Sequence, residues 1–398
     1  MGLIMNEKKS LTYEVARRYR KSNKAGKTAI LNEFTADTGY NRKYANRILM
    51  HERKEKIRYV KGRVVVLKIA HNRHIKRIYK KYYDAPVEKV VLHIWTDFNL
   101  MCGKLLTPLF KANLECFAAE PSYEIDLIIK RKLSKISVST VERMLKSGRK
   151  KLKLKGTCTT KPGITLKSQI PIRVFFNWNE RLPGFFEIDT VSHDGSFASG
   201  EYCFTLTVTD VFSGWTELRV FLNKAAKWVT EAMSDIYSSI PFEMKGADSD
   251  NGSEFINETM LKWCIEHKVT FTRNRPYKKN DNCFVEQKNG ACVRKTVGYR
   301  RYDGAVMLAN LNRVYDAYCP LLNYFYPCVK IISKERVGAK VKKVYEKPRT
   351  PFERLVERPL VSSEVKQELL KRKSNLNLME LKHQLDNALD ILMGTDPT

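Results

Sequence analysis

In the stretch ADSDNGSEF at residues 247–255, Asp250 follows a segment expected to be a short strand, PFEMKGADSD at 241–250, and precedes a turn. A second stretch, LPGFFEIDTVSHDG at 182–195, is apolar up to Asp189. Short apolar runs that end at turn-forming residues are typical of β-strands. We therefore expect Asp189 to end the first strand of a sheet and Asp250 to end the fourth.

Strand and helix patterns alternate around these two aspartates. Residues 201–221 form two β-rich runs around a turn at Ser213 and Gly214, and a further strand is expected at 268–274. Helices are expected at 223–240, 253–267 and 281–299. The order strand, strand, strand, helix, strand, helix, strand, helix predicts a mixed sheet flanked by helices, which is an α/β fold.

A third carboxylate, Glu286, lies in the helical stretch KKNDNCFVEQKN at 278–289. Between Asp189 and Asp250 there are 60 residues, and between Asp250 and Glu286 there are 35. Two strand aspartates, the second followed by Asn-Gly, and a helical glutamate at this spacing resemble the DDE motif of bacterial insertion-sequence transposases. Their catalytic core is similar to that of retroviral integrases, in the RNase H-like superfamily. The stretches 30–49 and 337–355 also resemble one branch of these transposases.

The resemblance implies a polynucleotidyl transferase that binds transposon terminal repeats. It would hydrolyse the phosphodiester at the element ends and join the freed 3′ hydroxyl to target DNA, without a covalent protein–DNA intermediate. Asp189 and Asp250 would share one metal ion, and Asp189 and Glu286 would hold a second. The resemblance also implies a bacterial protein of the cytoplasm, associated with the nucleoid when bound to DNA.

The chemistry of phosphodiester cleavage supports the same assignment. Two Mg²⁺ ions can activate the attacking group and stabilise the leaving oxygen. Mg²⁺ is a hard cation that prefers carboxylate, phosphate and water oxygens. We expect Mn²⁺ to substitute for it. Retroviral integrases carry a His-His-Cys-Cys zinc domain, but this sequence has no such pattern, so no zinc is expected.

Residues near the three carboxylates carry further expectations. Asn251 and Gly252 are expected to shape the turn and let DNA approach, although a plain tight turn would leave the same pattern. His193 and Asp210 are expected to be an ordinary polar residue and a turn residue. Asp248 and Asp281 are expected to be solvated or to stand behind the metal ligands. Contacts to the DNA backbone are expected from basic residues flanking Glu286, namely Lys278, Lys279, Lys288, Arg294 and Lys295.

Positive charge is concentrated in the front half of the chain. Residues 1–173 hold 40 of the 72 Lys and Arg but only 14 of the 43 Asp and Glu. A polyanionic partner explains this distribution better than a generally basic surface would, and that partner is expected to be double-stranded DNA. Joining two transposon ends would require at least a homodimer on DNA.

The first 60 residues are expected to form a helix-turn-helix DNA-binding domain. Two short helical stretches precede Gly39, and YNRKYANRILM at 40–50 predicts a third helix with Tyr44, Ala45 and Ile48 inward. An ordinary three-helix domain would show a similar pattern. The side chains expected to face outward and to contact DNA are Arg42, Lys43, Asn46 and Arg47.

A second helical DNA-binding domain is expected at 61–150. Its last helix, near residues 138–150, would begin with a capping box of Ser139 and Glu142. Val141, Met144 and Leu145 would form the apolar face of this helix. Arg143, Lys146, Arg149 and Lys150 would form its basic face, and we assign DNA contacts to the first two.

The remaining regions complete a multidomain architecture. Residues 151–173 contain no acidic residue and are expected to be a basic linker, followed by the catalytic core at 174–302. Residues 303–398 would form a small helical and basic β/α accessory region. Its last helix, with Leu378, Leu381, Leu385, Leu389 and Leu392 at helical spacing, is expected to pack on the body rather than on another subunit.

Composition also limits the setting in which the protein acts. No apolar run approaches the length that a membrane helix needs, so no membrane partner is expected. The nine cysteines include no Cys-x-x-Cys pair, which fits free thiols in a reducing cytoplasm.

Two other functional classes fit the sequence less well. One is a domesticated transposase that retains DNA binding as a catalytically silent regulator, and the intact triad argues against it. The other is a nuclease of the same superfamily that cuts without strand transfer. The tandem basic modules favour end-specific transposition over this nuclease.

Overall fold

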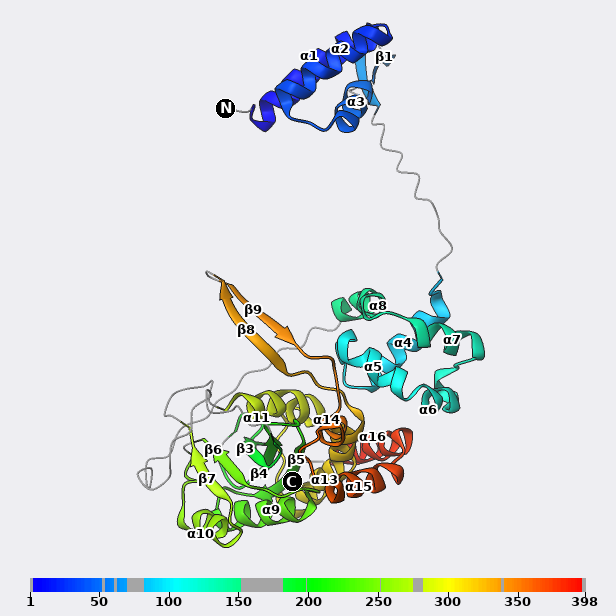
Figure 1. Cartoon of the computed structure of the whole chain (residues 1–398). Coiled ribbons are helices and arrows are strands. Elements are labelled where there is room, and N and C mark those ends of the chain that lie inside the picture. The colour runs from blue at the N-terminus through cyan, green and yellow to red at the C-terminus, as the bar shows by residue number, and fades with distance from the viewer. Residues whose placement is uncertain are drawn as a thin grey trace. The chain divides into compact units, whose positions relative to one another are not determined.

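The computed structural model of the chain describes residues 3–51, 54–60, 63–69, 82–151, 182–197, 199–250, 252–274, 282–337 and 340–395. Contacts divide the chain into two compact units, Met1–Lys81 and Tyr82–Thr398 (Figure 1). The finer domain boundaries expected at residues 60, 150, 173 and 302 remain predictions. Most of the expected linker, together with Asn251, Lys278, Lys279 and Asp281, lies outside the described residues.

The first unit is the three-helix arrangement expected from the sequence, followed by a hairpin. Phe34, Ala45 and Leu49 are among the buried side chains that hold the helices together. Gly39 ends the second helix with a φ of 67°, which favours glycine. The third helix buries Ala45 and Leu49 rather than Tyr44, which is 42% exposed, so that part of the predicted apolar face was wrong. The elements are α1 Met5–Lys21, α2 Lys24–Thr38, α3 Arg42–His51, β1 Lys54–Val60 and β2 Arg63–Ile69.

The second unit begins with a helical region, whose last helix buries Val141, Met144 and Leu145 as predicted. The predicted capping box was wrong, because the helix begins at Val138. The Ser137 hydroxyl accepts from the Thr140 amide at 3.3 Å, while Glu142 accepts from the Gly103 amide at 2.6 Å. The elements are α4 Ala85–Asp97, α5 Gly103–Ala112, α6 Leu114–Ala119, η1 Pro121–Tyr123, α7 Leu127–Lys135 and α8 Val138–Lys151.

A five-stranded mixed sheet with strand order β5-β4-β3-β6-β7 follows, and it confirms the predicted α/β class. β3, β4 and β5 are antiparallel neighbours, whereas β6 and β7 run parallel to β3. The elements are β3 Phe185–Ser192, β4 Cys203–Asp210, β5 Thr216–Leu222, α9 Ala226–Ser239, β6 Gly246–Ser249, α10 Glu258–Glu266, β7 Thr270–Arg273 and α11 Cys283–Lys288.

Two helices cover the face of the sheet that presents Asp189. Thr205 of β4 lies on this face, since Thr207 pairs with Asp189, and its hydroxyl is 2.9 Å from the Tyr315 hydroxyl of α13. On β3, Glu187 bonds to the first turn of α11. α11 continues through the π-helix η3 Asn289–Arg294 into α12 Lys295–Val297, and α13 spans Gly304–Pro320.

The C-terminal region packs on the sheet and adds a two-stranded hairpin (Figure 1). Asn312 of α13 and Asn323 beyond it bond to backbone groups of β5, which satisfies this edge of the sheet. Four of the predicted leucines of the last helix are buried and Leu389 is partly buried, which confirms packing on the body. The elements are η4 Leu321–Phe325, β8 Ile331–Val337, β9 Lys340–Tyr345, α14 Pro351–Glu357, α15 Ser363–Ser374 and α16 Leu378–Gly394.

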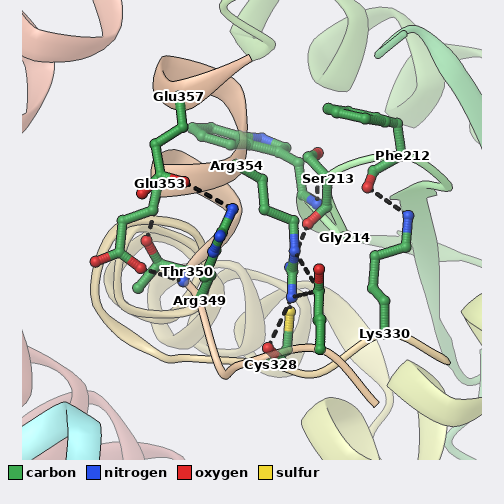
Figure 2. A network of polar contacts seen from close by, with 12 residues as sticks. Phe212, Ser213, Gly214, Cys328, Lys330, Arg349, Thr350, Glu353, Arg354 and Glu357 are labelled. Atoms are coloured by element: carbon green, nitrogen blue, oxygen red, sulfur yellow. Dashed lines mark hydrogen bonds and ion pairs between the residues drawn. The ribbon is translucent and has the colours of Figure 1, made fainter. Parts of the chain in front are cut away.

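The base of the β8–β9 hairpin is fixed to the β4–β5 turn by one buried and one half-buried cation (Figure 2). Arg354 of α14 donates to the Ser213 and Cys328 carbonyls, each at 2.7 Å, and to Glu346 at 2.8 Å. Lys330 donates to the carbonyls of Val211 and Phe212 at 2.8 and 2.5 Å. The hairpin is therefore attached to the sheet rather than to a separate core.

No helix in the described part of the chain is long and apolar enough to cross a membrane.

Candidate functional site

Two rows of carboxylates lie side by side on β3 and β6. The parallel register pairs Glu187 with Asp248 and Ile188 with Ser249. One further step sets Asp250, the residue directly after β6, beside Asp189. Side chains two residues apart on a strand share a face, so all four carboxylates belong to the same face of the sheet. Asp189 lies inside β3, which continues to Ser192, so the expectation that it ends the strand was wrong.

The carboxylate of Asp189 accepts two hydrogen bonds, one from a backbone amide of its own strand and one from a side chain of the crossing helix. Its Oδ1 accepts from the Thr190 amide at 2.8 Å, and its Oδ2 accepts from the side-chain amide of Asn289 at 2.7 Å. Burial, together with the negative charges of Asp250, Glu286 and nearby Glu254, raises the pKa of Asp189 well above its usual value. Asp250 and Glu286 are therefore near enough to Asp189 for their charges to disfavour its ionised form.

Glu286 is exposed on α11, near the start of the helix that crosses the sheet face. The residue before it, Val285, donates its backbone amide to Glu187 Oε2 at 2.8 Å. Three residues after it, Asn289 bonds to Asp189. Contacts to β3 on both sides of Glu286 thus set the position of this part of the helix.

Glu254 forms the border of the site on the far side of the DNG turn. It is 7% exposed, and it accepts from the Thr190 hydroxyl at 3.1 Å and forms an ion pair with Lys224. A Cβ at Gly252 would lie 2.5 Å from Glu254 Oε2 and 2.8 Å from Asp250 Oδ1. Glycine at this position therefore leaves room for two carboxylates, which is a more specific reason than a tight turn.

The donor chemistry of these residues fits a divalent cation. Carboxylate oxygens are what Mg²⁺ prefers, and a cation would relieve the repulsion that raises the pKa of Asp189. In the ranges that the structure describes, no three carboxylate, imidazole or thiol side chains are gathered closely enough to hold a metal ion together. The three carboxylates are therefore neighbours without forming a closed cluster, and Glu286 is the most exposed of the three.

Several residues near the site have structural roles. Asp248 is buried and accepts from the Thr272 hydroxyl, so it is not solvated. Asp210 accepts from the Ser213 amide at 2.6 Å and the Gly184 amide at 2.9 Å, as expected of a turn residue. His193 is fully buried, and its Nε2 is 2.7 Å from the Thr205 hydroxyl. It is therefore an ordinary polar residue, as expected.

Two of the basic residues expected to contact DNA are engaged within the protein. Lys288 donates to the Gly214 carbonyl at 3.2 Å, and Arg294 donates to the Ser192 carbonyl at 2.7 Å. Arg294 also stacks on the Tyr299 ring, with 4.8 Å to its centroid. Both side chains are half-buried, unlike Lys295, which is exposed. Among the described basic residues that flank Glu286, Lys295 is therefore the one whose side chain is exposed to solvent.

The predicted DNA-contacting faces of the helical regions point outward. On α3, the exposed residues include all four predicted ones, Arg42, Lys43, Asn46 and Arg47. Asn46 also accepts from the Tyr19 hydroxyl at 2.7 Å, so its amide oxygen is already used. On α8, Arg143 and Lys146 are exposed. DNA contact by these residues remains a prediction.

Sequence analysis did not identify Glu187, Glu254 and Asn289 as parts of the site. Each carried a signal that could have pointed to it. Glu187 is two residues before Asp189 on a strand, Asn289 is one helical turn after Glu286, and Glu254 is two residues after the DNG turn.

The mixed sheet with carboxylates on β3, β6 and α11 defines an integrase core domain protein. The family described as Integrase core domain matches residues 180–279. The chain belongs to the same family as y4rM, an uncharacterized protein of Sinorhizobium fredii. The two are 34% identical over 354 residues, which cover 88% of this chain and 96% of y4rM.

Two solved structures are similar to parts of the chain. One is the catalytic core domain of BIV integrase, 16% identical, with a TM-score of 0.27 over 43% of this chain and 91% of that one. The other is a simian T-cell lymphotropic virus intasome in complex with PP2A regulatory subunit B56 gamma. It is 14% identical, with a TM-score of 0.31 over 54% of this chain and 70% of that one. Because both TM-scores are low, the fold assignment rests on the strand order and on the family match.

Proposed function

We propose that this protein is a DNA transposase that cleaves the ends of its element and joins them to target DNA. The observation that supports the proposal is that Asp189 and Asp250 lie side by side on one face of the sheet, with Glu286 of α11 near Asp189. These are the residues whose sequence spacing resembles the DDE motif. The enzyme class follows from the Integrase core domain match, whereas transposition is the finer inference.

In this proposal the three carboxylates hold Mg²⁺, or Mn²⁺ in its place. When bound, the two ions would supply the charge that activates the attacking oxygen and stabilises the leaving oxygen. Asn289 keeps Asp189 oriented through its 2.7 Å bond, and Glu254, paired with Lys224, borders the site. Asp189 and Asp250 are adjacent in the strand register, which supports their sharing one ion.

The DNA partner is supported by the charge distribution. Exposed cations on α3 and α8 and at Lys295 are suited to contact phosphates. End joining requires two DNA ends, so we propose that at least two copies of the chain assemble on DNA. The action on double-stranded DNA in a bacterial cytoplasm is part of the same proposal.

The test is an assay of cleavage and strand transfer with the full chain, Mg²⁺ and a labelled duplex from the end of its own element. The variants are Asp189→Asn, Asp250→Asn and Glu286→Gln. Each removes a negative ligand, so we expect the rate to fall at least about 10³-fold with DNA binding nearly unchanged. Asp235→Asn on the exposed face of α9 is the matched control and should keep full activity.

The possible outcomes separate the classes of protein. Joined products from the wild type and none from the triad variants would support a transposase. Nicks without joining would instead indicate a nuclease. Sequence-specific binding without any chemistry in Mg²⁺ or Mn²⁺ would indicate a DNA-binding regulator.

A further inference from the structure

Glu187 is a buried carboxylate that the proposed chemistry does not use. It has no exposed surface and lies in the middle of β3, between β4 and β6. Its Oε2 accepts from the Val285 amide at 2.8 Å, and its Oε1 has no partner among the described residues. A buried carboxylate is costly unless it accepts hydrogen bonds, and the bond from the Val285 amide offsets part of that cost.

The Val285 amide is one of the donors that a helix leaves unsatisfied at its start. α11 begins at Cys283, so Val285 is the third residue of the helix. The preceding residue, Asn282, makes no side-chain capping bond within the described residues. A helix normally caps its first amides with a side chain from its own N-terminus. Here the acceptor comes from a strand almost 100 residues earlier.

The same strand holds the helix a second time. Asp189, two residues after Glu187, accepts from Asn289, four residues after Val285. Two residues along a strand span about 7 Å, and four residues along a helix span about 6 Å, so the two bonds match in spacing. Glu286 lies between them and is itself exposed. The two contacts therefore fix the part of the helix that carries Glu286.

We propose that Glu187 is a positioning residue that caps α11 from β3 and thereby places Glu286 beside Asp189. It acts as a hydrogen-bond acceptor, not as a metal ligand. The inference rests on the proposed function for its activity measurement, but the capping itself is a property of the chain alone.

The test compares Glu187→Met with Glu187→Gln in the full chain. Met has a similar length and no acceptor, whereas Gln retains a side-chain oxygen for the Val285 amide. We expect Glu187→Met to lower the cleavage rate about 10- to 100-fold and to raise the Mg²⁺ concentration needed for half-maximal rate. Glu187→Gln should restore both to near the wild-type values.

A second measurement does not depend on activity. Hydrogen exchange of the backbone amides at 284–289, in the full chain without metal, should accelerate about tenfold in Glu187→Met and stay slow in Glu187→Gln. Glu217→Met is the matched control. Glu217 is also a buried strand carboxylate, 6% exposed, but it accepts from Trp215 Nε1 at 2.8 Å rather than from α11. It should leave exchange at 284–289 unchanged.

Two results would overturn the proposal. One is exchange at 284–289 that is the same in Glu187→Met as in the wild type. The other is a Glu187→Gln variant as defective as Glu187→Met, because the charge and not the acceptor would then be required. If no protein in the series cleaves DNA, the proposed function fails, while the exchange comparison still decides the capping.

Discussion

The surroundings of a single core residue, His193, determine its protonation state. His193 directly follows β3, and its ring is enclosed by Thr205 at 2.7 Å and by Tyr302, with 5.4 Å between ring centroids. Burial, and then the positive charge of Arg294, lowers the pKa of His193 to about 3. The ring is therefore neutral in the folded protein near neutral pH.

This depressed pKa predicts a loss of stability in acid. In the unfolded chain His193 would titrate near its ordinary value of about 6.5. Its contribution to stability is fully present above that pH and is lost as pH falls toward 3, because only the unfolded state takes up the proton. We expect the free energy of unfolding to lose up to about 1.4 kcal/mol per pH unit through this residue.

The measurement is the urea midpoint between pH 4 and 6.5, followed by tryptophan fluorescence, for the wild type and His193→Gln. Glutamine does not titrate in this pH range. The slope of the unfolding free energy against pH should therefore be smaller in the variant, by an amount that corresponds to at most one proton. Identical slopes for the two proteins would show that His193 is protonated in the folded state.

Sequence patterns predicted the triad residues but not their immediate neighbours. Asp189, Asp250 and Glu286 could be found because their spacing and the DNG turn are visible along the chain. Glu187 could not be assigned a role in the same way. Its partner, Val285, is fixed only when α11 crosses β3, and neither residue type marks that contact in the sequence.

Elements of secondary structure were predicted well where one face is apolar and less well where polar side chains decide the boundary. The core strands and helices follow the predicted order. The start of α8 differed because Glu142, which fits a capping box, instead accepts from Gly103 on α5. Such a choice between a local and a distant donor depends on tertiary packing.

Arg354 is the more deeply buried of the two cations that attach the β8–β9 hairpin to the sheet. It is 6% exposed and donates to carbonyls of Ser213 and Cys328 as well as to Glu346 (Figure 2). Arg354→Met would leave the Glu346 carboxylate and the Ser213 carbonyl without the guanidinium donor, and the Cys328 carbonyl with only the Arg349 amide. We expect a loss of about 3–5 kcal/mol in the free energy of unfolding, measured by urea denaturation.

Two further variants test the reason for this loss. Arg354→Lys should recover little of it, because an ammonium group lacks the planar fork that reaches three acceptors in fixed directions. Arg349→Met is the matched control, since its ion pair with Glu357 is about half-exposed and should contribute less than about 1 kcal/mol. Equal losses from Arg349→Met and Arg354→Met would show that burial of the guanidinium is not what matters.

At the scale of the whole molecule, charge is divided between regions in a way that suits the proposed action on DNA. The front of the chain holds most of the excess Lys and Arg, whereas the core gathers carboxylates on one face. A carboxylate cluster repels DNA phosphates unless cations neutralise it. The affinity for DNA is therefore expected to come from the basic helical regions, and the chemistry from the core.

This division predicts that binding and chemistry can be separated by substitution. Changing Arg42, Lys43 and Arg47 on α3 to Ala together should weaken binding to the element end. The slope of log affinity against log salt concentration should become shallower by about 0.9 for each phosphate contact that is lost. For all three substitutions together the change should be about 2 to 3. Fluorescence anisotropy at several salt concentrations measures this slope. The control variant changes three exposed lysines of the second unit, Lys227, Lys262 and Lys371, to Ala.

At saturating DNA the α3 variant should retain the wild-type cleavage rate, because none of its substitutions touches the carboxylate face of β3. The control variant should retain both the salt slope and the rate, although the same number of positive charges has been removed. A slope that falls equally in both variants would mean that net charge, and not the face of α3, attracts the DNA. A cleavage rate lost along with the slope would mean that α3 contributes to the chemistry, against the division of roles argued from the charges.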